Sequence, residues 1–352
     1  MKAKNSGLVF NLAFLFLLLL GLSVRLVDLT DQPIDFHPTR QLRGAIIARG
    51  MYYEMAPAAD PALRQQTYAF WQSTGQYEPS ILERLTALTY LLLGREALWV
   101  ARLYSLLFWI IAGLFLFLLA QRMGMPRPNS PAQSVQVEAP AQGWHIASLS
   151  ALAGLAYFLF LPFAIQASRS FQPDPAMVMW LVLFVYALYH WSETHELKWA
   201  VMGGAFAGLA VLTKAVIIYP VAGAALALVL YTYRGKPFLS ILRNSQVWLV
   251  AGLMVIPTAV YYLARGGRAS EYFSSWTLAL SHLLLEPTFY LRWFNLAQEL
   301  LGWFALVLAL AGILLAAGRN RALLIGLWAG YLLYGLFLPY QMYTHSYYHL
   351  ML

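Results

Sequence analysis

The amino-acid sequence predicts an all-α polytopic membrane protein with about nine transmembrane helices and a long helical loop after the first of them. Of the 352 residues, 61% are hydrophobic and only 11% are charged, and the mean hydropathy is +0.61. A soluble domain carries about a quarter of its residues as charged side chains. Apolar runs of roughly 18 residues or longer recur along the chain, and each is long enough to cross a hydrocarbon core of about 30 Å.

The first apolar run follows two lysines, Lys2 and Lys4, and extends from Leu8 to Val24. It is long for a signal peptide and no small-x-small cleavage motif follows it, so we interpret it as an uncleaved anchor. The hydropathy pattern places the spans at about 8–27, 97–120, 144–166, 176–191, 199–213, 215–231, 247–264, 299–317 and 322–339.

The distribution of lysine and arginine predicts the orientation of these spans. Basic residues concentrate in four short connections, which the positive-inside rule places in the cytoplasm: Arg122–Arg127, Glu193–Lys198, Arg234–Arg243 and Arg319–Arg321. Residues 124–143 are rich in Pro, Ala, Gln and Ser, which predicts a disordered cytoplasmic linker. The chain has no cysteine, as is common in bacterial envelope proteins. We therefore expect a multi-pass protein of the cytoplasmic (inner) membrane.

The segment 28–96 is expected on the opposite, extracytoplasmic face and is too long for a simple connector. It begins with the polar side chains Asp28, Asp31, Asp35 and His37, and a helix is predicted from Thr39, as its cap, to Tyr53. Further along, one apolar stripe (Ile81, Leu82, Leu85, Leu88 and Leu92) lies opposite polar residues, as in a helix that rests in the membrane interface.

Ionisable residues near membrane depth cost about 2.5–3.5 kcal/mol each on insertion scales and therefore need an explanation. They stand at four places, which all map to the extracytoplasmic face: Arg102, the turn with Arg169 and Asp174, Lys214, and the pair His345 and His349. Each also has a structural interpretation, namely a snorkelling arginine, an ion pair that caps two helices, a hairpin turn and an interfacial aromatic belt.

The formal net charge of +8 is explained by the residues that flank the spans and by an anionic ligand, and no nucleic-acid partner is expected. The chain also lacks a glycine-rich phosphate loop, so a nucleotide-driven machine is not expected.

Several short motifs, taken in order, resemble glycosyltransferase family 39, whose members are polytopic GT-C enzymes. The first loop supplies Asp35, Ala48, Arg49, Tyr52 and Tyr53, followed by Glu78–Pro79 and Gly94. Later segments supply Ala101–Arg102–Leu103, Asp174 in QPDP, Thr213–Lys214, and His345 with Tyr347 and Tyr348. The family often has Asp-Glu in the first loop, whereas Phe36 follows Asp35 here. Family members also usually continue with more spans, and the unfinished apolar run YYHLML leads us to expect residues beyond Leu352.

The resemblance implies a GT-C-like transmembrane domain over 1–352 that transfers a sugar, with inversion, from a polyprenyl-phosphate donor to an acceptor hydroxyl. Asp35 would be the base, Arg102, Arg169 and Lys214 would bind the donor phosphate, and Asp174 would be the second carboxylate. The remaining predicted substrate-binding residues are His37, Arg40, Arg49, Tyr52, Glu78, His345, Tyr347 and Tyr348. No cofactor is required, although Asp35, His37, Asp174 and His345 are compatible with a divalent metal ion.

Two other functions stay open at this point. The ionisable residues near membrane depth would also suit a transporter or flippase of an anionic lipid or glycan. Composition alone also permits a non-catalytic envelope assembly subunit.

Overall fold

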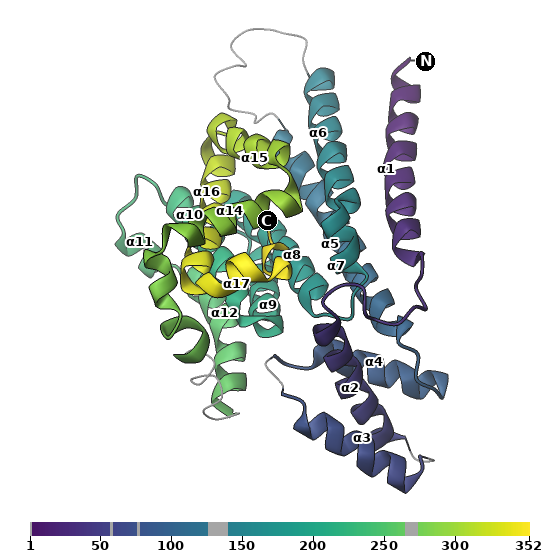
Figure 1. The fold of residues 1–352 in the computed structure, drawn as a ribbon. Helices are drawn as coiled ribbons and strands as arrows, with labels where there is room; N and C mark the ends of the chain where they lie inside the picture. Colours follow the sequence, from purple (N-terminus) through teal and green to yellow (C-terminus); the bar gives the residue numbers. More distant parts are fainter. Residues whose placement is uncertain (1, 57–58, 76–77, 126–139, 265–273) are drawn as a thin grey trace.

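The computed structural model describes residues 2–56, 59–75, 78–125, 140–264 and 274–352, and no β-strand occurs among them (Figure 1). The long helices of the bundle are α1 (Lys2–Leu26), α5 (Trp99–Gly124), α6 (Pro140–Phe160), α8 (Asp174–Thr194), α9 (Leu197–Thr213), α10 (Ile218–Thr232), α12 (Ser245–Ala264) and α16 (Gly318–Phe337). The others are α2 (Pro38–Met55), α3 (Pro61–Ser73), α4 (Ile81–Leu93), α7 (Pro162–Ser168), α11 (Leu239–Leu242), α14 (Pro287–Leu301), α15 (Trp303–Leu315) and α17 (Pro339–Thr344), with short turns η2 (Ala215–Ile217), η3 (Ser274–Leu278), η4 (Ser281–Leu285) and η5 (Ser346–His349).

The predicted count of nine spans is not confirmed. Within the described residues, five helices are long and apolar enough to cross a membrane, or up to seven if each of two bent helix pairs counts as one span. Helix α9 has only 17 residues. The apolar stretch predicted at 299–317 is interrupted at Gly302, where α14 and α15 meet at 100°. A hydropathy window averages over such a break, so the hydropathy pattern alone does not locate it.

The segment between α1 and α5 contains three helices, α2, α3 and α4, which lie across the lower end of the bundle (Figure 1). Helix α2 begins one residue earlier than predicted. Its N-cap residue is His37, in the left-handed conformation at φ 48°, and not Thr39. Helix α4 buries Leu82 and Thr86, whereas Leu88 and Leu92 of the predicted apolar stripe are exposed. Exposed apolar side chains of this kind suit a helix at a lipid interface.

Three of the connections predicted to be cytoplasmic meet at one end of the bundle. The Glu193 carboxylate, at the end of α8, accepts a hydrogen bond from Arg122 Nε at 2.9 Å and another from Arg319 Nη1 at 3.0 Å. The ends of α5 and α8 and the start of α16 therefore share one surface. The predicted linker at 124–143 begins near the same end. Its ends at Gly124 and at 140–143 are helical, and 126–139 lie outside the described residues.

Helix α8 forms the centre of the bundle and packs against α5, α9 and α10. Most of its side chains are buried, among them Met177, Phe184 and Leu188. The helix starts at Asp174–Pro175, and a proline suits the first turn because that position needs no amide donor. Helix α9 ends at Lys214, whose extended backbone (φ −155°, ψ 107°) separates it from η2. These two ends bring Asp174 and Lys214 together.

Helices α10 and α16 approach each other at backbone distance through glycines. A methyl group on Gly223 would collide with the carbonyl oxygen of Gly326, and the Cα atom of Gly330 would lie only 3.2 Å away. Small residues allow close helix contact in membranes, where lipid removes much of the hydrophobic drive for helix association.

We expect Gly223→Ala to lower the free energy of unfolding by about 1–3 kcal/mol, because the added methyl group overpacks two backbones. Gly154→Ala in α6 is the matched control, since nothing lies within 4 Å of the added carbon. The control should be neutral, or stabilising by up to about 1 kcal/mol through helix propensity. Thermal unfolding of both variants in one detergent measures the difference, and equal midpoints would contradict the close packing.

Candidate functional site

A buried ion pair lies where α8 begins and α9 ends. The Lys214 ammonium donates to Asp174 Oδ1 at 2.7 Å, and the two residues are 4% and 0% exposed. The other oxygen of this carboxylate, Oδ2, is buried without a hydrogen-bond partner among the described residues. An ion pair so fully removed from water is costly to form, and it is costly to break by removing one partner.

Two tyrosines from the end of the sequence cover the Lys214 ammonium. Its nitrogen lies 4.6 Å from the ring centroid of Tyr347 and 4.3 Å from that of Tyr348, within the range of cation–π attraction. The His345 ring lies 5.6 Å from Tyr347 and 5.9 Å from Tyr348. The late motif singled out in the sequence therefore contacts Lys214, about 130 residues earlier in the chain.

His37 connects the first loop to this ion pair. Its Nε2 atom lies 2.8 Å from Ser346 Oγ, and its ring meets the Tyr347 ring edge-on at 4.8 Å. Burial lowers the pKa of His37, and the charges of His345, Lys214 and Arg40 act in the same direction. The imidazole is therefore neutral at neutral pH, and one ring nitrogen is left to accept a hydrogen bond.

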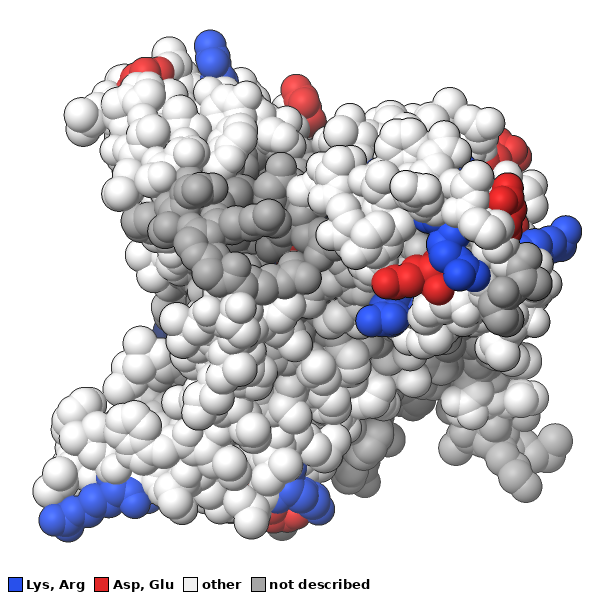
Figure 2. Space-filling model, turned by 90° about the horizontal axis from the view of Figure 1, so that it is seen from below, with Lys and Arg blue, Asp and Glu red and all other residues white. Residues whose placement is uncertain are grey.

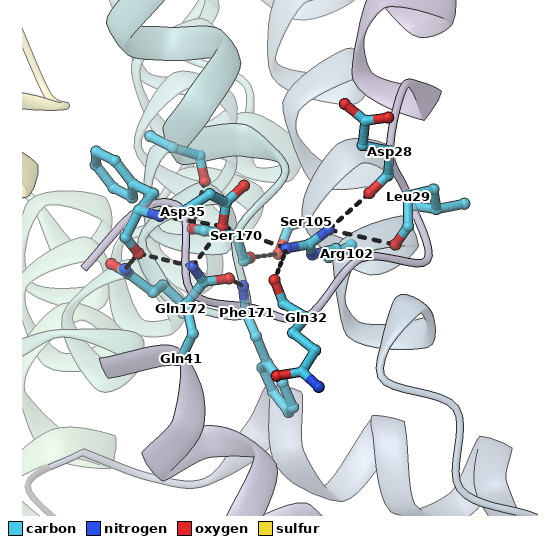
Figure 3. A network of polar contacts seen from close by, with 12 residues as sticks. Asp28, Leu29, Gln32, Asp35, Gln41, Arg102, Ser105, Ser170, Phe171 and Gln172 are labelled. Atoms are coloured by element: carbon cyan, nitrogen blue, oxygen red, sulfur yellow. Dashed lines mark hydrogen bonds and ion pairs between the residues drawn. The ribbon is translucent and has the colours of Figure 1, made fainter. Parts of the chain in front are cut away.

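Asp35 lies next to His37 in sequence, at the centre of a polar network (Figure 3). Its Oδ1 atom accepts hydrogen bonds from the Phe36 amide at 3.0 Å, Gln41 Nε2 at 2.9 Å and Arg102 Nη2 at 3.2 Å. None of these contacts uses Oδ2, and 43% of the Asp35 side chain is exposed. One oxygen is thus fixed by the protein, and the carboxylate is open to solvent.

Opposing effects act on the Asp35 carboxyl. Burial raises its pKa, but the hydrogen bond from Gln41 and the positive charge of Arg102 lower it and outweigh burial. The pKa of Asp35 is therefore below its usual value, and the group is ionised at neutral pH. An ionised carboxylate with an exposed oxygen can accept a proton.

The Arg40 and Glu78 pair lies beside the Tyr347 ring. Arg40 Nη2 donates to Glu78 Oε1 at 2.7 Å, and the guanidinium lies 5.7 Å from the Tyr347 centroid. Together with Arg43, Ser80, Glu83 and Pro173, the pair lines a small cleft between α2, α4 and the start of α8.

Two predicted substrate-binding residues have other partners. Arg49 Nε pairs with Glu96 at 3.2 Å. Tyr52 is buried in the apolar contact between α2, α4 and α5, where its ring meets Tyr90 edge-on at 5.8 Å. The structure therefore gives Tyr52 a packing role, and it does not bring Arg49 into contact with the ion pair.

Arg169 ends helix α7, close enough for its charge to act on Arg102. A second arginine near it, Arg25, was missed in the sequence because it stands at the end of a span, where a snorkelling arginine is expected. Arg25 is fully buried; its Nε donates to Ser168 Oγ at 2.5 Å and its Nη1 to Gly21 O at 2.8 Å. No sequence pattern predicted the contact between Arg25 and Ser168.

Residues 145–262 match the family model described as dolichyl-phosphate-mannose-protein mannosyltransferase. The match supports a membrane glycosyltransferase of the GT-C type. It covers about a third of the chain and includes Arg169, Asp174 and Lys214, whereas Asp35, Arg102 and the late tyrosines lie outside it. Neither the curated proteins nor the solved structures gave a match.

The described surface of the molecule includes areas that suit contact with lipid. Seen from below, the acidic and basic side chains of the described residues gather at a few places (Figure 2). Exposed apolar side chains also run along α1 and α15, for example Phe16 and Phe304. Such surfaces suit lipid contact.

The candidate metal ligands do not converge. Among the described residues, no three His, Asp or Glu side chains come together in a group that could hold a metal ion. Asp35 is paired with Arg102 and Asp174 with Lys214, so a cation already occupies one oxygen of each carboxylate. The present side-chain positions therefore do not fit a metal site.

Proposed function

We propose that this GT-C-type glycosyltransferase moves a sugar from a polyprenyl-phosphate donor to an acceptor hydroxyl on the extracytoplasmic face of the cytoplasmic membrane. The observation that supports this most is the Asp35 carboxylate, which is fixed through Oδ1, ionised and 43% exposed. A general base needs such an oxygen within hydrogen-bond reach of the acceptor proton.

The reaction needs one base and no general acid. The acceptor oxygen attacks the anomeric carbon while the bond from that carbon to the phosphate oxygen breaks, and the hydroxyl proton moves to Asp35. The lipid phosphate leaves with the bonding electrons, so cations stabilise the transition state. Lys214 and Arg169 are the proposed cations: Lys214 bonds to Asp174 at the start of α8, and Arg169 ends α7 in the turn that precedes α8. Direct attack inverts the anomeric centre, unlike the two-step course of a retaining enzyme.

The proposal is tested by incubating purified protein in lipid nanodiscs with a panel of polyprenyl-phosphate sugars and candidate hydroxyl acceptors. The release of lipid phosphate and the appearance of glycosylated acceptor should rise together for at least one pair. The anomeric configuration of the product, measured by NMR, should be opposite to that of the donor. Transport of lipid without transfer would instead favour a flippase, and retention of configuration would exclude direct attack.

Transfer is expected to be independent of divalent metal ions, because Arg102 and Lys214 already neutralise the two carboxylates. After dialysis against EDTA, the transfer rate should stay within about twofold of the untreated rate, since electrostatic stabilisation comes from fixed cations. Addition of Mg²⁺ or Mn²⁺ to the dialysed protein is the matching measurement. A loss of activity that only a metal restores would overturn this expectation.

A further inference from the structure

The Arg102 guanidinium donates its hydrogen bonds to one segment of the chain, residues 28–35. Its Nη1 donates to the carbonyl oxygens of Asp28 at 3.0 Å and Leu29 at 3.4 Å, and its Nη2 to that of Gln32 at 3.1 Å and to Asp35 Oδ1. The side chain is 1% exposed. The guanidinium thus lies inside the curve of the 28–35 segment, with both terminal nitrogens bonded to it (Figure 3).

Gln41 holds the same carboxylate from the other side. Its Nε2 atom donates to Asp35 Oδ1 and to Phe36 O at 2.7 Å, and its Oε1 accepts from the Phe171 amide at 2.9 Å. The side chain is fully buried. The glutamine therefore ties the base to the turn that precedes α8, the helix that begins with Asp174.

These contacts change the role predicted for Arg102. A phosphate would have to compete with four protein acceptors for a guanidinium that is almost completely buried. We infer that Arg102, assisted by Gln41, is a positioning residue that holds the 28–35 segment and aims the exposed oxygen of Asp35 at the acceptor. This inference rests on the proposed function of Asp35 as the base.

A positioning residue and a donor-binding residue have different kinetic signatures. Misplacement of the Asp35 carboxylate lowers kcat and leaves the donor KM unchanged, whereas loss of a phosphate contact raises the donor KM. A misplacement of about 1 Å can cost about 100-fold in rate. The guanidinium charge also lowers the pKa of Asp35, so its removal should move the acid limb of the pH–rate profile to higher pH. The other charged groups that act on Arg102 are Arg169, Asp31 and Asp28.

The test compares Arg102→Gln, Arg102→Lys and, as a surface control, Arg84→Gln in full-length protein in nanodiscs. Arg102→Gln should lower kcat by about 10- to 100-fold at constant donor KM and shift the acid limb upward. Arg102→Lys keeps the charge but cannot bridge the four acceptors, so it should lower kcat less and leave the acid limb in place. Arg84→Gln should behave as wild type, because Arg84 is exposed.

A rise in donor KM at constant kcat would overturn the inference, and so would wild-type kinetics in both Arg102 variants. If Arg102→Gln does not fold, Arg102→Lys still decides between these results. Hydrogen exchange of residues 28–36, measured by mass spectrometry, adds a readout that needs no activity. Exchange of this segment that increases in the Arg102 variants more than exchange of α2 does supports the anchoring. Exchange of this segment that is the same in the variants as in wild-type protein overturns it. Absence of transfer by wild-type protein with every donor would count against the proposed function, whereas the exchange result still decides the anchoring.

Discussion

The Asp35→Asn variant is expected to transfer sugar about 100- to 10,000-fold more slowly than wild type, the usual contribution of a general base. Asparagine has nearly the same shape as aspartate, and its amide oxygen can still accept from Phe36, Gln41 and Arg102. Its NH2 group would then take the position of Oδ2, where it cannot accept a proton. The fold and the donor KM should be unchanged, because only the proton acceptor is lost.

The pH–rate profile of wild-type protein supplies the matching test. Since the pKa of Asp35 is lowered, its carboxylate should stay ionised at pH values where an ordinary aspartate takes up a proton. The transfer rate should stay constant over that range and fall only as the pH drops through the lowered pKa. Asp31→Asn is the control, because Asp31 is exposed in the same segment and does not bond to Gln41 or Arg102. Equal rates in Asp35→Asn and Asp31→Asn would remove Asp35 from the mechanism.

The Lys214→Met variant is expected to lose about 3–5 kcal/mol of unfolding free energy, because it leaves the Asp174 carboxylate buried without its cation. Asp174 is fully buried, and its second oxygen lacks a partner among the described residues, so no compensating contact is in place. The double variant Lys214→Met, Asp174→Asn removes both charges and should recover most of this loss. Denaturant unfolding of the two single variants and the double variant in one detergent gives the coupling energy.

An exposed ion pair provides the control for this cycle. Lys198 bonds to Glu196 at 2.5 Å, but their side chains are 62% and 46% exposed. Water and salt screen such a pair, so Lys198→Met should change the unfolding free energy by less than about 1 kcal/mol. If Lys214→Met were no more disruptive than Lys198→Met, the buried pair would be far weaker than its geometry indicates.

The sequence predicted which ionisable residues to examine, because charges are rare in an apolar chain and each one stands out. The structure places Asp174 and Lys214 in contact, and Tyr347 and Tyr348 over the same ammonium. Their catalytic roles stay predictions. Glutamine carries no such signal, so Gln41 was overlooked although it bonds to Asp35 and to the Phe171 amide.

Other features depended on three-dimensional arrangement. Two such features are the 100° bend between α14 and α15 and the left-handed conformation of His37. They depend on tertiary packing, which a local sequence pattern does not predict. Arg49 and Tyr52 carry a family motif, but Arg49 lies on the part of α2 that faces Glu96, and Tyr52 packs against Tyr90. Family motifs that occur in the expected order predict which segments lie near the site. They do not predict which side chains of those segments face a substrate.

The enclosure of Lys214 has a thermodynamic consequence for any anion that binds there. The ammonium already has a carboxylate at 2.7 Å and two aromatic rings within 5 Å, so an incoming phosphate exchanges contacts and does not simply gain them. Only the surplus over the displaced carboxylate and rings would appear as affinity. Tight ground-state binding at this cation is therefore not expected. Its strongest attraction would be to the species with the most negative charge, which in the proposed reaction is the departing phosphate.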